Sequence, residues 1–174
     1  MNSSAFRGGF TLVELMVVIV VMGILSTIAV PKLFGQIAKA KASEIMPSAG
    51  AYIHLQNTFN IEHEGVIGSW KTIGYSMKSN SNIKYSENGT EGGVAPATYT
   101  TDEGETAAWI AENRVPFNDC AANSVWQIDV LKSPSNEQYV VYDVKITGGA
   151  GSACAVLTNN FASLDTYNGT IDAP

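Results

Sequence analysis

The sequence predicts an α+β fold in which a long, kinked N-terminal helix packs on a C-terminal antiparallel β-sheet. Three observations lead to this expectation. A nearly continuous apolar run covers residues 12–30, an amphipathic helical pattern continues through residues 32–64, and alternating apolar and polar residues occupy 125–131 and 138–147. The 174 residues are the right number for a single domain.

Charged residues make up 15% of the chain, against roughly 25% in a typical soluble protein. The deficit is local, because charges are nearly absent from residues 10–30 and occur at ordinary frequency afterwards. The formal net charge is −6, and the basic residues are dispersed except for Lys32, Lys39 and Lys41 after the apolar run. This distribution argues against nucleic-acid binding, which needs clustered Lys and Arg, and favours a solvated helix face near lipid headgroups.

The apolar run is a candidate membrane-spanning helix. Its roughly 19 residues form a helix of about 28 Å, which is close to the hydrocarbon thickness of a bilayer. A secretory signal peptide is a poorer interpretation, because the run is too long and the small residues Gly8 and Gly9 precede it. Processing before the run would leave this helix on the mature protein.

Glu14 is not explained by a simple membrane anchor. A carboxylate inside a spanning helix costs several kcal/mol on insertion scales, so such residues are rare and usually paired. Because Glu14 lies one turn from the start of the run, one interpretation is a tolerated interfacial residue. The other is a functional charge that pairs with a partner.

The string R-G-G-F-T-L-V-E-L followed by a long apolar helix resembles the class III leader junction of type IV pilins and the related pseudopilins. The resemblance covers about the first 31 residues and departs from the usual pattern in having two glycines after the arginine. It implies that residues 1–9 are a leader, which prepilin peptidase removes by cutting after Gly9. The same enzyme would methylate the new N-terminus at Phe10.

The resemblance also implies the ladle-shaped pilin fold and gives residues of segment 10–31 a role in filament assembly. The charged amine that cleavage creates at Phe10 would pair with Glu14 of its own or a neighbouring subunit. In a medium of low dielectric, such a pair favours one axial register. Gly23 and Pro31 lie where pilins commonly carry a glycine and a proline, and both allow the helix to kink or lose helicity when helices crowd together.

From residue 32 to residue 64 the apolar residues recur at steps of three to five, as a one-sided helix requires. Pro47 is expected to bend this helix or to begin a new turn, and Gly65 is its expected end. We therefore expect one kinked helix beginning at about Phe10, with its second half packed under a globular head of residues 65–174.

The head is expected to contain a variable part at residues 65–122, an antiparallel sheet at 123–159 and a tail at 160–174. Three strands are predicted in the sheet, at residues 125–131, 138–147 and 153–158, and the first two form a hairpin.

The variable part of the head is less regular. Strands are predicted at residues 70–77 and 83–85 and a surface loop at 86–105, whereas residues 107–113 fit a helical turn and a strand equally well. The three tryptophans of the head are expected to be core anchors: Trp70, Trp109 and Trp126.

Cys120 and Cys154 are the only cysteines, and two cysteines alone are compatible with buried reduced thiols. The resemblance implies a head in an oxidising compartment, and many pilins carry a C-terminal disulfide, so a Cys120–Cys154 bridge is expected. Closing a loop of about 35 residues would stabilise the head by roughly 3–4 kcal/mol in the chain-entropy model.

Few residues indicate other chemistry. His54 and His63 are too far apart in the helix to form an i, i+4 metal pair. The acidic loop 102–105 and the tail 165–172 lack the regular oxygen-ligand spacing of a calcium site. No nucleophile elbow, phosphate-binding loop or zinc pattern occurs in the sequence. We therefore expect no catalytic residue, no metal and no cofactor.

With the resemblance, the sequence predicts a structural protein and not an enzyme. The expected protein is a type IV pilus subunit, present first as a single-pass inner-membrane precursor with a periplasmic head. Prepilin peptidase would process it, and the pilus assembly machinery would polymerise it into an extracellular homopolymer. One alternative is a pseudopilin of a type II secretion system. Another is a membrane-tethered enzyme or binding domain, which predicts no cleavage and tolerance of Glu14→Ala.

Overall fold

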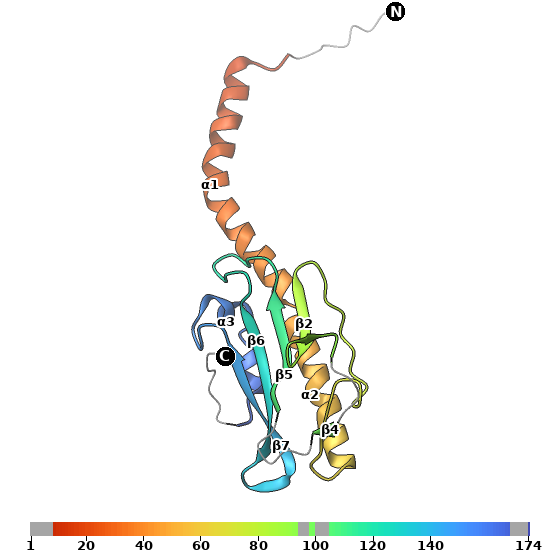
Figure 1. The fold of residues 1–174 in the computed structure, drawn as a ribbon. Helices are drawn as coiled ribbons and strands as arrows, with labels where there is room; N and C mark the ends of the chain where they lie inside the picture. The colour runs from red at the N-terminus through yellow and green to blue at the C-terminus, as the bar shows by residue number, and fades with distance from the viewer. Residues whose placement is uncertain (1–8, 94–97, 100–104, 168–173) are drawn as a thin grey trace, which may run out of the picture. The chain divides into compact units, whose positions relative to one another are not determined.

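A computed structural model describes residues 9–93, 98–99, 105–167 and 174 (Figure 1). Its helices are α1 (Leu12–Ala42), α2 (Ile45–Glu62), α3 (Ala153–Leu157) and the short 3-10 helix η1 (Phe161–Leu164). Its strands are β1 (Ile67–Gly68), β2 (Ile83–Glu87), β3 (Thr90–Glu91), β4 (Thr98–Tyr99), β5 (Glu105–Asn113), β6 (Val125–Ser133) and β7 (Asn136–Ile146). The predicted α+β class is confirmed. The chain divides into a helical unit that ends at Gln36 and a head that begins at Ile37.

The expected long, kinked helix is confirmed, and a turn at residues 43–44 divides it into α1 and α2. Pro47 lies in the first turn of α2. Backbone N–H groups in a first turn have no partner within the helix, so the missing N–H of a proline is tolerated there. The prediction that Pro47 begins a new turn is confirmed. The helix ends as expected before Gly65, whose positive φ of 92° lets its N–H bond to the Asn60 carbonyl at 3.1 Å.

The head is built on a five-stranded antiparallel sheet with the strand order β3-β2-β5-β6-β7. The predicted hairpin is confirmed as β6–β7, and the strand predicted at residues 83–85 is confirmed as β2. Residues 107–113, which fitted two structures equally well, belong to β5 in the middle of the sheet. β5 pairs with β2 on one side and β6 on the other. These strands supply the hydrogen-bond partners that its backbone N–H and C=O groups would otherwise have within a helical turn.

Two predicted strands are wrong. Residues 153–157 form α3, because Ser152 Oγ accepts the N–H of Ala155 at 3.2 Å and caps a short helix. Residues 70–74 form turns and residues 75–77 belong to no strand, since the N–H groups of Ile73 and Tyr75 bond to carbonyls four or five residues earlier. The sheet therefore does not lie within residues 123–159 as predicted, because β2, β3 and β5 come from the preceding part of the head.

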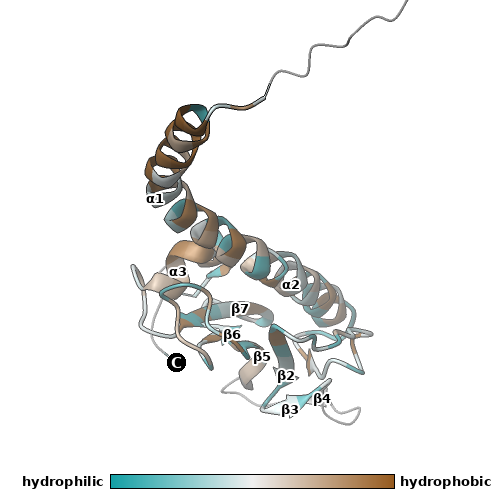
Figure 2. Ribbon diagram, turned by 90° about the horizontal axis from the view of Figure 1, so that it is seen from above, coloured by the Kyte–Doolittle hydropathy of each residue, from teal (hydrophilic) through white to brown (hydrophobic). Residues whose placement is uncertain are grey.

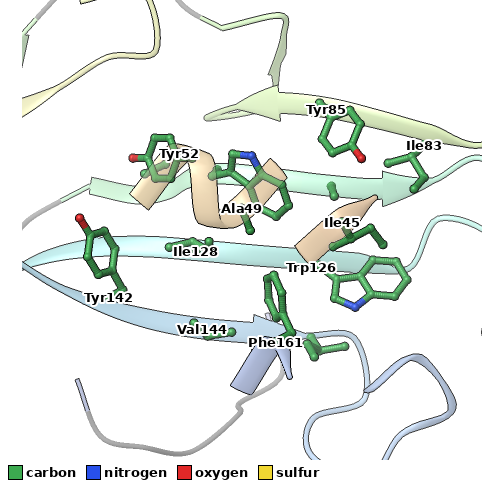
Figure 3. Close-up of a cluster of buried hydrophobic side chains, with 14 of the residues drawn as sticks. Ile45, Ala49, Tyr52, Ile83, Tyr85, Trp126, Ile128, Tyr142, Val144 and Phe161 are labelled. Carbon is green, nitrogen blue, oxygen red and sulfur yellow. The ribbon is translucent and has the colours of Figure 1, made fainter. Parts of the chain in front are cut away.

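The core lies between α2 and one face of the sheet (Figure 3). Ile45, Ala49 and Tyr52 of α2 face side chains from β6 and β7, such as Ile128 and Val144, which are directly opposed in the register. The three tryptophans are each fully buried, which confirms them as core anchors. They carry much of the apolar area removed from water, and each indole N–H has a hydrogen-bond acceptor.

The exposed edge of the sheet at β7 is partly covered by the segment that follows η1. Thr166 donates its N–H to the Tyr142 carbonyl at 2.9 Å, and its hydroxyl accepts the Tyr142 N–H at 2.8 Å. Asp165 accepts the N–H of Val144 at 3.0 Å. These bonds satisfy edge groups that would otherwise be a template for unwanted strand pairing.

Candidate functional site

The predicted processing site lies at the start of the described chain. Gly9 is exposed, with no atom within 4 Å of the position that a Cβ would occupy, and Phe10 is 77% exposed. Neither residue belongs to a helix or strand, so the peptide bond between them is not held in regular structure. The other residues of the predicted leader, with Arg7, lie outside the described residues. Cleavage of this bond stays a prediction.

Glu14 takes part in capping α1, which the sequence reasoning missed. Thr11 precedes the first helical residue, and its hydroxyl accepts the Glu14 N–H at 3.2 Å, while the Thr11 carbonyl accepts the N–H of Leu15 at 3.2 Å. The T-x-x-E spacing is the signature of a capping box and was the available signal. The Glu14 carboxylate also lies in the first turn of α1, where the positive end of the helix dipole favours negative charge.

The first three-quarters of α1 form an exposed apolar surface. Figure 2 shows hydrophobic colouring along the successive turns of this helix. The segment Leu12–Glu62 includes a stretch that is long and apolar enough to cross a membrane by length and composition, and none of that stretch is buried. A surface helix of a soluble protein is polar on one side, and large exposed apolar surfaces mark membrane or protein contacts. The exposed large apolar residues of the helical unit are Phe10, Leu12, Val13, Leu15, Met16, Val17, Val18, Ile19, Val20, Val21, Met22, Ile24, Leu25, Ile28, Val30, Leu33 and Phe34.

Gly23 and Pro31 both lie within α1, which is assigned as continuous helix through them. Pro31 has no N–H, so the Thr27 carbonyl lacks its usual helical donor. The hydroxyls of Ser26 and Thr27 bond to carbonyls of the preceding turn, Met22 O at 2.8 Å and Ile24 O at 2.7 Å, and such bonds locally compete with the helix ladder. Loosening of this stretch when helices crowd together stays a prediction.

Cys120 and Cys154 form the predicted disulfide, with a Cα–Cα distance of 4.8 Å and a sequence separation of 34. The bridge joins the loop before β6 to α3, and both cysteines are buried. On the same loop, Phe117 and Cys120 exchange backbone hydrogen bonds at 2.9 and 3.2 Å. In the sequence, a glycine-rich turn separates α3 from the last strand of the sheet. The bridge therefore gives α3 a second, covalent connection to the sheet through the loop before β6.

The other candidate residues are not brought together into a site. His63 stacks on Phe59 at 4.0 Å between ring centroids, and its Nδ1 lies 3.0 Å from the Phe59 carbonyl, whereas His54 is exposed. Asp102 and Glu103 of the acidic loop and residues 168–173 of the tail lie outside the described residues. Among the residues that the structure does describe, no group of three or more His, Cys, Asp or Glu could hold a metal ion.

One charged cluster on the outer face of the hairpin was not foreseen. Asp129 and Asp143 are directly opposite in β6 and β7, and Lys145 Nζ lies 2.6 Å from Asp129 Oδ2 and 3.5 Å from Asp143 Oδ2. Burial raises the pKa of the Asp143 carboxyl, and the Lys145 ammonium only partly opposes this. The hydrogen bond to Asp129 raises the pKa of Lys145. Alternation along each strand places both carboxylates on the same face of the sheet. Their direct opposition depends on the pairing register of β6 and β7, which the alternation does not determine.

Comparison with known proteins agrees with the geometry of the N-terminal segment. A family model described as the prokaryotic N-terminal methylation motif matches residues 5–30. Three sequences of the type IV major fimbrial protein FimA of Dichelobacter nodosus are each 45% identical to this chain over 46 residues. The matched part of the chain is type IV pilin-like.

The pilin-like similarity covers 26% of this chain, and the chain spans only 29–30% of the length of these fimbrial relatives. No solved structure matches the chain significantly. The family model covers the predicted leader junction and the apolar part of α1.

Proposed function

We propose that this chain is the structural subunit of a type IV pilus. In this proposal prepilin peptidase removes residues 1–9, methylates Phe10 and releases a subunit that polymerises through α1 into a surface filament. Before assembly the precursor lies in the inner membrane with α1 spanning the bilayer and the head in the periplasm. Its partners are copies of itself, the peptidase and the pilus assembly machinery.

The observation that carries the proposal is an apolar helix that is exposed along its whole first part and has a single carboxylate in its first turn. In water this surface would be strongly unfavourable, so it needs either lipid or other helices around it. A bilayer suits the precursor, and a bundle of identical helices suits the filament. Both environments disfavour an unpaired Glu14 carboxylate.

Cleavage would supply the partner for Glu14. The new amine at Phe10 lies one helical turn before Glu14 in sequence and carries a positive charge when protonated. Within a bundle of low dielectric, an unpaired charge is heavily penalised, whereas a pair is tolerated. A neighbouring helix is therefore favoured at the axial position where its carboxylate meets this amine. Gly23 and Pro31 would let the intervening stretch adjust to the crowded bundle.

A pseudopilin of a type II secretion system is the second candidate, because the leader junction and apolar helix are common to both classes. The matched relatives are major fimbrial proteins, which favours the pilus. Imaging cells with an antibody to the head distinguishes the two functions. Long surface filaments carrying the antibody are expected, and short periplasmic assemblies without such filaments would favour the pseudopilin.

The role of Glu14 is tested by separating its charge from its place in the helix cap. Glu14→Gln keeps the size and the capping capacity at this position but removes the charge. Thr11→Ala removes the hydroxyl that caps the Glu14 N–H, at about 1 kcal/mol, and keeps the charge. We expect Glu14→Gln to lower the yield of sheared filaments by about tenfold or more, because a buried pair loses one partner, and Thr11→Ala to assemble nearly normally.

Both variants should retain a head that resists protease and contains the Cys120–Cys154 bridge. Normal filaments from Glu14→Gln would contradict the pairing, and so would an equal loss in both variants, since capping alone would then account for the effect.

A further inference from the structure

Two unlike surface features lie at opposite ends of α2 within the head. The first is a groove of about 350 Å³ between the α1–α2 junction and α3, here called the α3 groove. Its apolar lining includes Met46 and Leu157, and Val156 lies in it with 53% of its surface exposed. Lys39 lines the same groove and is exposed. The rest of its lining is largely polar and includes Ser43, Thr158, Asn159 and Asn160. The α3 groove thus combines apolar and polar surface with a positive charge at one side.

The second feature is here called the Ile61 patch and consists of Ile61, Glu64, Gln138 and Tyr139. These residues line a shallow hollow of about 160 Å³ between the end of α2 and the beginning of β7. Ile61 is 70% exposed and Tyr139 is 56% exposed, which makes them the two most exposed large apolar side chains of the described head. Glu64 is exposed beside them, so this patch is apolar and negatively charged.

The two features lie at different ends of α2. Met46 lies in the first turn of α2 and Ile61 in the last, about 22 Å apart at 1.5 Å per residue. Figure 1 likewise shows α3 at one end of the sheet and the turn of the β6–β7 hairpin at the other. A contact between unlike patches on two copies is heterologous, and when its rotation does not close a ring it builds an open filament.

We propose that the Ile61 patch of one head docks into the α3 groove of a second copy of this chain, with Glu64 facing Lys39. The opposite charges of the two features select this pairing, since groove on groove or patch on patch would bring like charges together. The volume of the groove lies at the low end of the range for ligand pockets and suits two exposed side chains, Ile61 and Tyr139. The inference rests on the proposed filament and adds a contact between heads to the packing of α1.

Cross-linking in assembled filaments tests the proximity directly. The full chain is produced in a bacterium that has a pilus assembly system and lacks its own major subunit. Sheared filaments of the double variant Ile61→Cys, Val156→Cys are treated with a short bismaleimide and separated on a denaturing gel. We expect a ladder of covalent multimers, because each subunit would join two neighbours. The control pair Ile61→Cys, Thr90→Cys places the second thiol on exposed β3 and should give no ladder.

A charge exchange tests the selectivity of the contact without added thiols. Glu64→Lys and Lys39→Glu should each lower filament yield by about fivefold or more, as expected for disruption of an interface contact. The two substitutions together should restore most of the yield. The control Lys78→Glu, at an exposed lysine outside both features, should assemble normally.

The outcomes separate this inference from the proposed function. Absence of the ladder in filaments, an equal ladder from the control pair, unaffected single charge variants, or a double variant no better than the singles would each overturn the docking of heads. In all these cases filaments of the unsubstituted chain leave the proposed function standing. Failure of the unsubstituted chain to form any filament would contradict the proposed function itself.

Discussion

Removal of the Cys120–Cys154 bridge tests how the head is stabilised. We consider the double variant Cys120→Ala, Cys154→Ala, because single substitution would leave a free thiol. Both cysteines are buried, at 1% and 4% exposure, so alanine fits each site with little loss of apolar contact. The main expected effect is on the unfolded chain, which gains the freedom of a loop that the bridge had closed.

The magnitude follows from the separation of 34 residues between the two cysteines. The chain-entropy relation gives about 3.8 kcal/mol at 25 °C for a loop of this length. For a domain of this size, each kcal/mol shifts Tm by roughly 3–5 °C, so we expect Tm to fall by about 10–20 °C.

The three tryptophans are fully buried in the head, so their fluorescence reports its unfolding. The full chain is heated in detergent with and without reductant, alongside the double variant. Reduced wild-type chain should melt with the variant, and the variant should be insensitive to reductant. A fall of less than about 3 °C would refute the reasoning, because the unfolded loop would then have little freedom to gain.

Three further substitutions test the packing and electrostatics of the head, each measured as the change in Tm of the full chain. Asp143→Asn should stabilise the head by about 0.5 kcal/mol at pH 7, because it removes a like charge opposite Asp129. Since the raised pKa of Asp143 means that its protonated form favours folding, this gain should vanish below about pH 4, and a gain that persists there would contradict it. Gly68→Ala should destabilise by about 1–3 kcal/mol, because its Cβ would lie 2.6 Å from Ile73 Cγ2. Gly50→Ala, with no atom within 4 Å of its new Cβ in α2, should be neutral or stabilising by up to about 1 kcal/mol, and equal effects of the two alanines would contradict the packing account.

Features with long, regular patterns were predictable from the sequence. The apolar run and the one-sided pattern after it predicted helices at α1 and α2, and Pro47 indicated a new helical start. Strict alternation around Trp126 and Ile128 predicted the β6–β7 hairpin, because only a half-buried strand places every second residue in a core. The disulfide followed from the compartment that the leader resemblance implied.

Features decided by tertiary contacts were not predictable in this way. The five apolar residues of α3 are too few to show a helical period, and only the capping by Ser152 distinguished them from a strand. Residues 70–77 alternate like a strand, but their backbone does not pair with a neighbouring strand. The Trp70 N–H instead donates to the buried Glu87 carboxylate at 2.8 Å, a contact that the sequence does not reveal. In the candidate site, the predicted leader junction could be identified from the sequence. The Thr11 cap had a sequence signal that was overlooked. The charged features at the two ends of α2 could be found only from the fold.

The central claim is that cleavage between Gly9 and Phe10 creates the subunit that assembles. The most direct measurement is the intact mass of the protein extracted from membranes and from sheared filaments of cells that produce the full chain. We expect a mass that lacks residues 1–9 and carries one added methyl group, located on Phe10 by fragmentation. Filaments built from chains that still begin at Met1 would contradict it.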